Sequence, residues 1–313
     1  MDEVKSLNSD RLTFCSEKES ADHFPEISAI PYFCPMQLFH RKFGKPGNQP
    51  LLILHGLFGI SDNWVSYGKR IAVEGFEVFI LDMRNHGQSP QSDNFNYLAL
   101  TDDLFDFIDE QEIDEPIIIG HSMGGKVAMR FALENPFMVK KLIVVDITMK
   151  TYGPRPHHRK IIQAMKSVDL SIVKNRREVE EELAKYIPEI RIRQFILKNL
   201  HRKSDNSFEW RIYLPGIETN LDSMFDAIDT IIKFDKPSLF IKGGASDYIL
   251  LEDFEQIRYN FPNAEIVTIE GTSHWVHVEA AEKFYLLTSG FITGDPTWYN
   301  EVDYRGITSR RPL

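Results

Sequence analysis

Short apolar runs, rich in isoleucine, leucine and valine, recur along most of the chain and constrain its fold more than any other feature. Polar and apolar residues do not alternate within them, which is typical of strands buried on both faces in a parallel sheet. Helix-compatible segments lie between the runs, for example at 98–108. This alternation predicts an α/β fold with a mostly parallel, doubly wound sheet. The runs occupy residues 50–54, 76–81, 116–119, 141–145, 238–241 and 264–269.

One more strand is expected at 33–40, before a turn rich in glycine and proline. The alternation breaks between about residues 148 and 234, where charge-rich helical segments appear. Because this stretch lies between two expected strands, it predicts a helical cap inserted over the carboxyl edge of the sheet, where open α/β sheets bind ligands. The sequence therefore predicts a loose leader at 1–28, a core at 29–147 and 235–293, a cap at 148–234 and an extension at 294–313.

The composition of the 313 residues narrows the class of partner. Hydrophobic residues make up 42%, and the formal net charge of −10 argues against nucleic acid or an anionic membrane surface as a partner. No apolar run approaches the ~18 residues that a transmembrane helix needs, and the first residues contain no apolar signal-peptide core. We therefore expect an intracellular protein without a membrane span that acts on a small molecule.

The pentapeptide Gly-His-Ser-Met-Gly at 120–124 follows one of the apolar runs and precedes a helix-compatible stretch at 125–133. A G-x-S-x-G turn between a buried strand and a helix lifts the serine Oγ clear of the backbone. The glycines are needed because such a turn leaves no room for side chains on either side of the serine. No cysteine lies in this region, so a thiol nucleophile or a thiolate zinc site is not expected there. The pattern predicts that Ser122 is a nucleophile.

A serine hydroxyl needs a positioned base to take its proton. His274 is the best of the ten histidines, because it lies just after the last expected strand, at the same edge of the sheet as Ser122. The order along the chain is then serine, aspartate, histidine, as this kind of fold requires. His277, three residues further on, is the nearest rival.

The base needs a carboxylate to fix its tautomer, and the residues offer two. Asp247 follows the next-to-last expected strand, which is the commonest place for this acid. Asp146 ends the strand that follows the nucleophile's helix, and its carboxylate emerges at the same edge. Spacing alone slightly favours Asp247.

An acyl-transfer site also needs donors for the oxyanion of the tetrahedral intermediate. Met123, the residue after the nucleophile, supplies one backbone N–H in this prediction. The loop after the first core strand, at 55–59, supplies the other, with Leu57 preferred and Phe58 as the alternative. The polar loop at 82–89 is expected to act as scaffold rather than in the chemistry.

Four motifs in order resemble those of the α/β-hydrolase superfamily, and the resemblance spans about residues 50–291. Within it, the set is similar to the small YbfF-type bacterial esterases, to their mitochondrial abhydrolase relatives and to yeast ethanol acetyltransferases. The motifs are His-Gly-Leu-Phe-Gly at 55–59, Asp-Met-Arg-Asn-His-Gly at 82–87, Gly-His-Ser-Met-Gly-Gly-Lys at 120–126 and His-Trp-Val-His at 274–277.

The resemblance bears on the acid. In the YbfF-type pattern the loop after the next-to-last strand lacks an aspartate where this chain has Asp247, and the acid corresponds to Asp146. The resemblance therefore implies the triad Ser122, Asp146 and His274, with Asp247 in reserve, and oxyanion donors at Leu57 and Met123. This choice runs against the spacing argument.

The resemblance also implies the reaction. It indicates acyl transfer from short-chain esters or thioesters through an acyl-enzyme, by a carboxylesterase, a thioesterase or an alcohol acetyltransferase that makes ethyl acetate from ethanol. No metal or organic cofactor is expected, acetyl-CoA being a substrate, and the resemblance points to mitochondria. The alternative is a non-catalytic receptor for a small ligand on the same fold.

Trp210, Tyr213 and Phe225 are candidates for the cap lining, and His157 and His158 are expected on a solvated face.

Overall fold

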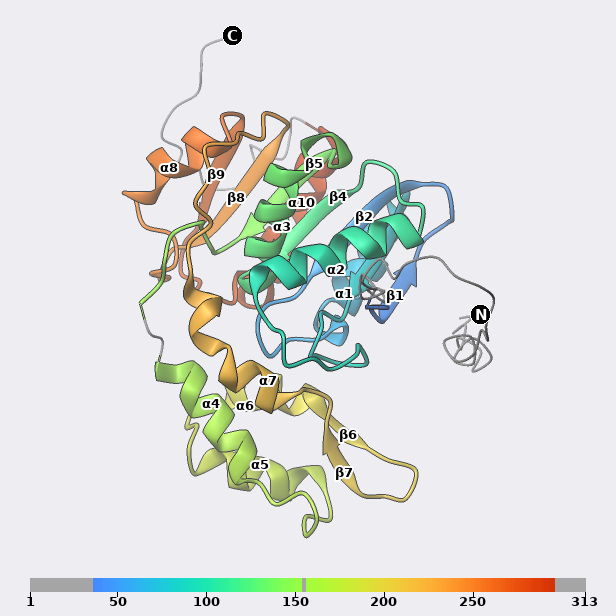
Figure 1. The fold of residues 1–313 in the computed structure, drawn as a ribbon, viewed down its shortest axis with the longest axis vertical. Helices are drawn as coiled ribbons and strands as arrows, with labels where there is room; N and C mark the ends of the chain where they lie inside the picture. Colours follow the sequence, from blue (N-terminus) through green and yellow to red (C-terminus); the bar gives the residue numbers. More distant parts are fainter. Residues whose placement is uncertain (1–35, 154–155, 296–313) are drawn as a thin grey trace, which may run out of the picture. The chain divides into compact units, whose positions relative to one another are not determined.

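The computed structural model describes residues 36–153 and 156–295, and its centre is a seven-stranded sheet (Figure 1). The strand order is β1-β3-β2-β4-β5-β8-β9, in which β1 is antiparallel to β3 and every other neighbouring pair is parallel. The mostly parallel sheet expected from the apolar runs is therefore confirmed. The strands are β1 (His40–Phe43), β2 (Gln49–Leu54), β3 (Phe76–Leu81), β4 (Ile117–His121), β5 (Lys141–Val145), β8 (Ser238–Gly243) and β9 (Ala264–Ile269).

Helices cover both faces of the sheet. Alternate residues of a strand point to opposite faces, so Leu52 packs in one apolar cluster with Val127 of α3, and Ile53 packs in the other with Ile71 of α1 and Leu287 of α10. Both faces of the central strands are buried, which explains the unbroken apolar runs at 51–54, 117–119 and 142–145. The core helices are α1 (Val65–Val73), α2 (Tyr97–Glu110), α3 (Met123–Glu134), α8 (Asp253–Asn260), α9 (Val276–Glu279) and α10 (Ala281–Thr293), with 3₁₀ turns η2 (Ser61–Asn63) and η3 (Pro136–Met138).

The strand expected at 33–40 is wrong in its position. Strand β1 begins at His40, and residues 36–39 are not in a strand, while 33–35 lie outside the described residues. The register explains the difference: His40 pairs with Leu81, the last residue of β3, so the chain before His40 has run past the end of its partner strand. A ladder needs a partner, and the apolar pattern at 33–39 does not reveal where that partner ends.

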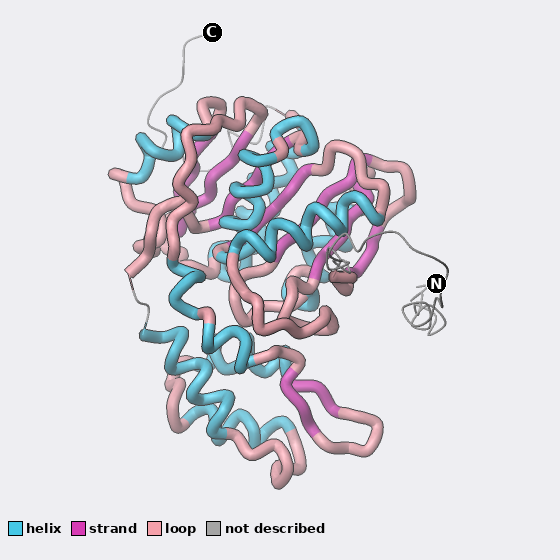
Figure 2. The backbone as a smooth tube through the Cα atoms, in the orientation of Figure 1, coloured by secondary structure: helices cyan, strands magenta, loops and turns pink. Residues whose placement is uncertain are grey.

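Between β5 and β8 the chain forms the expected cap, which is mostly helical (Figure 2). It also contains a two-stranded hairpin that was not expected from the sequence. The signal was present in the turn-forming Asp205, Asn206 and Ser207: Asn206 has a φ of 68°, and Ser207 N donates to Asp205 Oδ1 at 2.9 Å. The cap elements are α4 (Pro156–Ser167), α5 (Arg176–Ala184), α6 (Ile190–Ile196), η4 (Leu197–Asn199), β6 (Leu200–Arg202), β7 (Phe208–Trp210), α7 (Leu214–Thr219) and η5 (Leu221–Phe225).

A buried lysine of α3 holds the two connections between core and cap. The Lys126 ammonium donates to the carbonyl oxygen of Lys150 at 3.0 Å, on the way into the cap, and to that of Asp226, on the way out. The connections also bond to each other, since Tyr152 N donates to Phe225 O at 2.9 Å. Desolvation lowers the pKa of Lys126 to about 8. The residue limits proposed for core, cap, leader and extension stay predictions.

Candidate active site

The carboxyl ends of the parallel strands meet at one edge of the sheet, and a cavity of about 350 Å³ opens there. Loops that follow the strands line it together with cap helices α4 and α6. Of the residues predicted from the sequence, Leu57, Ser122, Asp247 and His274 line this cavity. Small-molecule sites commonly have volumes of about 300–1,000 Å³, so this cavity suits a small substrate.

Ser122 sits in a sharp turn between β4 and α3. Its backbone has a φ of 52° and a ψ of −118°, a conformation that residues other than glycine rarely adopt. A Cβ on Gly120 would lie 2.3 Å from Gly124 O, and one on Gly124 would lie 2.4 Å from Leu54 O. The glycines are thus needed for close approach of the backbone, as the tight turn predicted. Ser122 itself faces the cavity.

His274 follows β9 and contacts a carboxylate from the end of β5. Its Nδ1–H donates to Oδ2 of Asp146 at 2.8 Å. Gly243 N also donates to Asp146, at 2.9 Å to Oδ1, and the Ser246 hydroxyl donates to Oδ2. The Asp146 side chain is fully buried, whereas Asp247 is exposed at the cavity wall. The structure therefore brings Asp146 to the imidazole, and its role as the triad acid stays a prediction.

Residues that the sequence did not single out fix the imidazole of His274. The Tyr248 ring stacks on it, with 3.7 Å between ring centroids and 15° between planes. The carbonyl oxygen of His274 accepts a hydrogen bond from Nε2 of His121 at 2.9 Å. Two residues around the His274 imidazole and Asp146 lay in segments already singled out: His121 in the motif at 120–124, and Ser246 in the glycine-rich loop chosen for Asp247.

The loop after β2 approaches the serine closely. A Cβ on Gly56 would lie 2.8 Å from His121 Nδ1 and 3.1 Å from Ser122 Cβ, so only glycine fits. The Phe58 N–H already donates to Nε2 of His86 at 3.1 Å, which removes the alternative oxyanion donor. Among the described residues, no group accepts from the Leu57 N–H. Met123 begins α3, where the first N–H groups lack helical acceptors.

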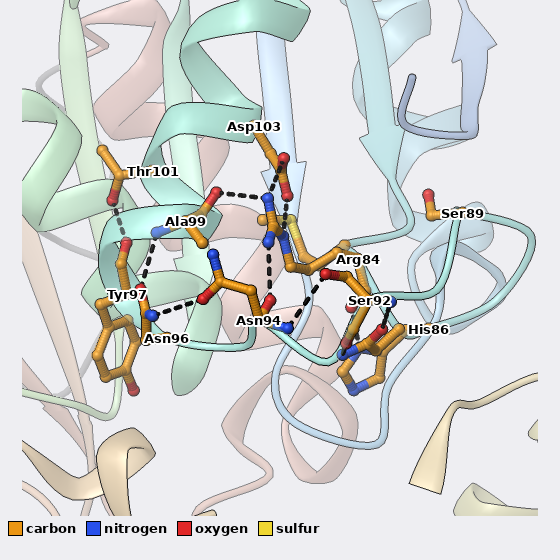
Figure 3. A network of polar contacts seen from close by, with 12 residues as sticks. Arg84, His86, Ser89, Ser92, Asn94, Asn96, Tyr97, Ala99, Thr101 and Asp103 are labelled. Carbon is orange, nitrogen blue, oxygen red and sulfur yellow. Dashed lines mark hydrogen bonds and ion pairs between the residues drawn. The ribbon is translucent and has the colours of Figure 1, made fainter. Parts of the chain in front are cut away.

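The polar loop after β3 acts as scaffold, and Figure 3 shows its contacts. The Arg84 guanidinium forms a double ion pair with Asp103, at 2.5 and 2.6 Å, and donates to the carbonyl oxygens of Asn94 and Ala99. His86 donates from Nδ1 to Arg84 O at 2.9 Å. Burial lowers the pKa of His86 to about 3, so the ring stays neutral and Nε2 remains an acceptor.

His277, the rival base, also lines the cavity, but its surroundings disfavour the charged form that a base must reach. Its ring stacks on Trp64, with 4.3 Å between centroids and 6° between planes. Desolvation lowers its pKa to about 3, which makes it a weak proton acceptor near neutral pH.

The cap lining differs from the one expected. Trp210 and Tyr213 are not among the lining residues, because the Trp210 indole donates to Met165 O and the Tyr213 hydroxyl to Asp93. Phe225 packs behind His158 instead, with 5.6 Å between ring centroids. His157 is exposed, as expected for a solvated face, and His158 is half-buried; both also line the cavity. The cap residues that line it are His157, His158, Ile161, Ile192 and Phe195.

Comparisons with known proteins agree with this fold. A family model described as "alpha/beta hydrolase fold" matches residues 49–179. The "sn-1-specific diacylglycerol lipase ABHD11" of Danio rerio is 38% identical, over 78% of this chain and 79% of that protein. "Esterase YbfF" of Escherichia coli is 34% identical, over 74% of this chain and 88% of that protein.

Two further proteins are informative. The "Probable alcohol acetyltransferase" of Saccharomyces cerevisiae is 34% identical, over 75% of this chain and 74% of that protein. The solved structure of a "Marine microorganism esterase" superposes with a TM-score of 0.77 at 43% identity, covering 82% of this chain and 99% of that chain. The groups that the motifs resemble are the groups found here, so the resemblance is confirmed.

Proposed function

The chain belongs to the α/β-hydrolase fold family and is a hydrolase of the esterase type, and we propose that it transfers short acyl groups through an acyl-enzyme on Ser122. The observation that carries the proposal is the 2.8 Å hydrogen bond from His274 Nδ1 to Asp146 at the cavity that Ser122 faces. A buried carboxylate bonded to Nδ1 leaves Nε2 as the proton acceptor.

In the proposed mechanism, His274 Nε2 takes the Ser122 proton as Oγ attacks the substrate carbonyl. The N–H groups of Leu57 and Met123 hold the oxyanion, and Asp146 stabilises the imidazolium. The tetrahedral intermediate then collapses, the imidazolium gives its proton to the leaving alkoxide or thiolate, and an ester remains on Ser122. Water or an alcohol attacks that ester by the same steps in reverse. The mechanism needs no metal or organic cofactor, which stays a prediction.

The cavity supports the choice of short acyl groups. Its volume of about 350 Å³ has to hold both the acyl group and part of the leaving group. Ile161, Ile192 and Phe195 give it an apolar wall, which suits a hydrocarbon chain. Thioesters fit the same reaction, since only the leaving atom differs.

The first test is reaction with an activity-based probe. Wild-type protein incubated with a fluorophosphonate is expected to lose turnover of nitrophenyl acetate while Ser122 gains the phosphonyl group, as read by peptide mass. Ser122→Ala is the control and should neither label nor turn over the ester. A folded wild-type protein that is active but labelled at another serine would show that the nucleophile is wrong.

A second candidate is alcohol acetylation, which the named yeast relative favours. The catalytic groups are the same, and the acceptor alone differs. Acetyl-CoA and ethanol incubated with the enzyme should then give ethyl acetate well above the hydrolysis background. Acetate as the sole product would remove this candidate and leave hydrolysis.

Three other expectations concern a receptor role, a membrane span and the location in the cell. The comparisons give no support to a non-catalytic receptor. Within residues 36–153 and 156–295, no helix is long and apolar enough to cross a membrane. The intracellular and mitochondrial locations stay predictions, which fractionation of the host cell with the tagged protein would test.

A further inference from the structure

Phe58, in the loop proposed to hold the oxyanion, is in an unfavourable backbone conformation. Its φ is 64°, in the left-handed region that a bulky residue rarely adopts, and such conformations persist only where neighbouring groups hold them. The side chain is buried, with 1% exposed. Specific neighbouring groups must therefore keep this peptide in place.

Two buried side chains hold Phe58, one on each of its polar backbone groups. From the core, Nε2 of His86 accepts from the Phe58 N–H at 3.1 Å. From the cap, Nδ2 of Asn199 donates to the Phe58 carbonyl oxygen at 2.8 Å. His86 is 1% exposed and Asn199 is 0% exposed, so water does not compete for these bonds. We call His86, Phe58 and Asn199 the Phe58 clamp.

The cap side of the Phe58 clamp is itself anchored next to the core side. The Asn199 carbonyl oxygen accepts from Arg211 N at 2.8 Å, and the Arg211 carbonyl oxygen accepts from Gly87 N at 2.8 Å. Gly87 directly follows His86 in the chain. Cap and core therefore meet through consecutive hydrogen bonds at the place where they hold Phe58.

The Asn199 side chain makes this contact although, within the described part of the chain, its amide oxygen is left without a hydrogen bond. Among the described residues, its Oδ1 is buried without a hydrogen-bond partner. A buried acceptor left unpaired is destabilising, and an apolar side chain of similar size would avoid that cost. An asparagine at this position therefore fits a functional requirement for the amide donor better than a requirement for stability.

We propose that Asn199 is a positioning residue: with His86 it fixes the Phe58 peptide and so aims the neighbouring Leu57 N–H at the oxyanion. The inference rests on the proposed acyl-transfer function. It makes the cap part of the transition-state machinery rather than only a wall of the cavity. Displacing the cap at Asn199 would then lower turnover even when the substrate still binds.

The test compares two cap asparagines. Asn199→Leu removes the donor to Phe58, and Asn220→Leu is the matched control, because Asn220 Nδ2 donates to the core carbonyl of Asp93 and to Gly216 O, both at 2.8 Å, away from Phe58. For Asn199→Leu we expect kcat and kcat/KM for nitrophenyl acetate to fall together, by about 10–100-fold, as for loss of a contact made in the transition state. For Asn220→Leu we expect less than about a threefold change.

Further variants keep the test decisive. Asn199→Ser retains a hydroxyl donor and should recover part of the loss, and His86→Leu should reproduce the loss from the core side if Asn199→Leu does not fold. An active wild-type enzyme with equal losses in Asn199→Leu and Asn220→Leu would overturn the inference alone, as would a rise in KM at constant kcat. A wild-type protein that neither turns over the ester nor labels at Ser122 would overturn the proposed function, and the inference with it.

Discussion

The sheet edge and the cap contribute to the cavity in different ways. At the edge, Asp146 accepts hydrogen bonds from Gly243, Ser246 and His274, and two neutral histidines accept from backbone N–H groups. The cap lines the cavity with side chains from α4 and α6, and Asn199 bonds directly to the loop at Phe58. The edge supplies the proposed catalytic groups, whereas the cap supplies an apolar wall and, through Asn199, one hydrogen bond to the loop at Phe58.

The largest effect should come from the edge. Ser122→Ala removes the nucleophile, and we expect turnover of nitrophenyl acetate to fall by about 10⁵-fold or more. The measurement is the steady-state rate beside the rate with buffer alone. Residual activity within about tenfold of wild type would mean that the edge does not carry the chemistry.

The second effect separates two carboxylates of the same edge. Asp146→Asn should lower kcat by about 10³–10⁴-fold, because the amide can hold the wrong tautomer of His274. Asp247→Asn, which changes an exposed side chain, should cost less than about tenfold. Both are compared on the same ester, and the reverse ranking would move the acid to Asp247.

The third effect contrasts ion pairs of the core and the cap. Arg84→Leu leaves the Asp103 carboxylate buried and unpaired, so the free energy of unfolding should fall by about 3–5 kcal/mol. The matched cap variant is Arg159→Leu, which breaks an exposed pair with Asp222 and should cost less than about 1 kcal/mol. Urea unfolding followed by circular dichroism measures both, and similar losses would contradict the contrast.

The fourth effect is the pH dependence of stability at the edge. Burial lowers the pKa of His55 to about 4 and of His86 to about 3, below the usual 6.5 of the unfolded chain. The unfolded chain therefore binds protons below pH 6.5 that the folded chain does not. The contribution of these histidines to the free energy of unfolding has its full value above pH 6.5. It falls with acidification towards pH 3–4, by at most about 1.4 kcal/mol per pH unit for each histidine. Urea unfolding at pH 7 and pH 5 checks the slope, and His86→Gln should reduce it by one histidine's share.

The smallest effect should come from the cap wall. Phe195→Ala enlarges the cavity and removes one ring contact with Trp275 at the edge but no hydrogen bond of the proposed triad, so kcat for nitrophenyl acetate should change by less than about threefold. The ratio of kcat/KM for the hexanoyl ester to that for the acetyl ester should rise by about tenfold. This is the lower end of the change in kcat/KM that one methylene group makes in an apolar pocket. Ratios of kcat/KM for the two esters test this, and Val278→Ala, an exposed position in α9, is the control.

Local patterns predicted much of this molecule. The run at 116–119, the glycines at 120 and 124 and the helix-compatible stretch after them predicted the turn at Ser122, because strand, turn and helix are consecutive in the chain. The strands of the parallel sheet were also predicted, because burial on both faces requires apolar residues at consecutive positions. The start of β1 and the hairpin of the cap were not, because one depends on where β3 ends and the other on a short turn within a charged stretch.

The sequence by itself determined the fold class, the serine turn and the place of His274 after the last strand. Spacing slightly favoured Asp247 and the resemblance implied Asp146, and the tertiary structure decided that Asp146 bonds to His274 Nδ1, a contact between side chains 128 positions apart. It also decided that Asn199 meets Phe58, 141 positions away. Periodicity and turn chemistry record only near neighbours, whereas a hydrogen bond depends on the angle and reach of two side chains after all the intervening chain has packed.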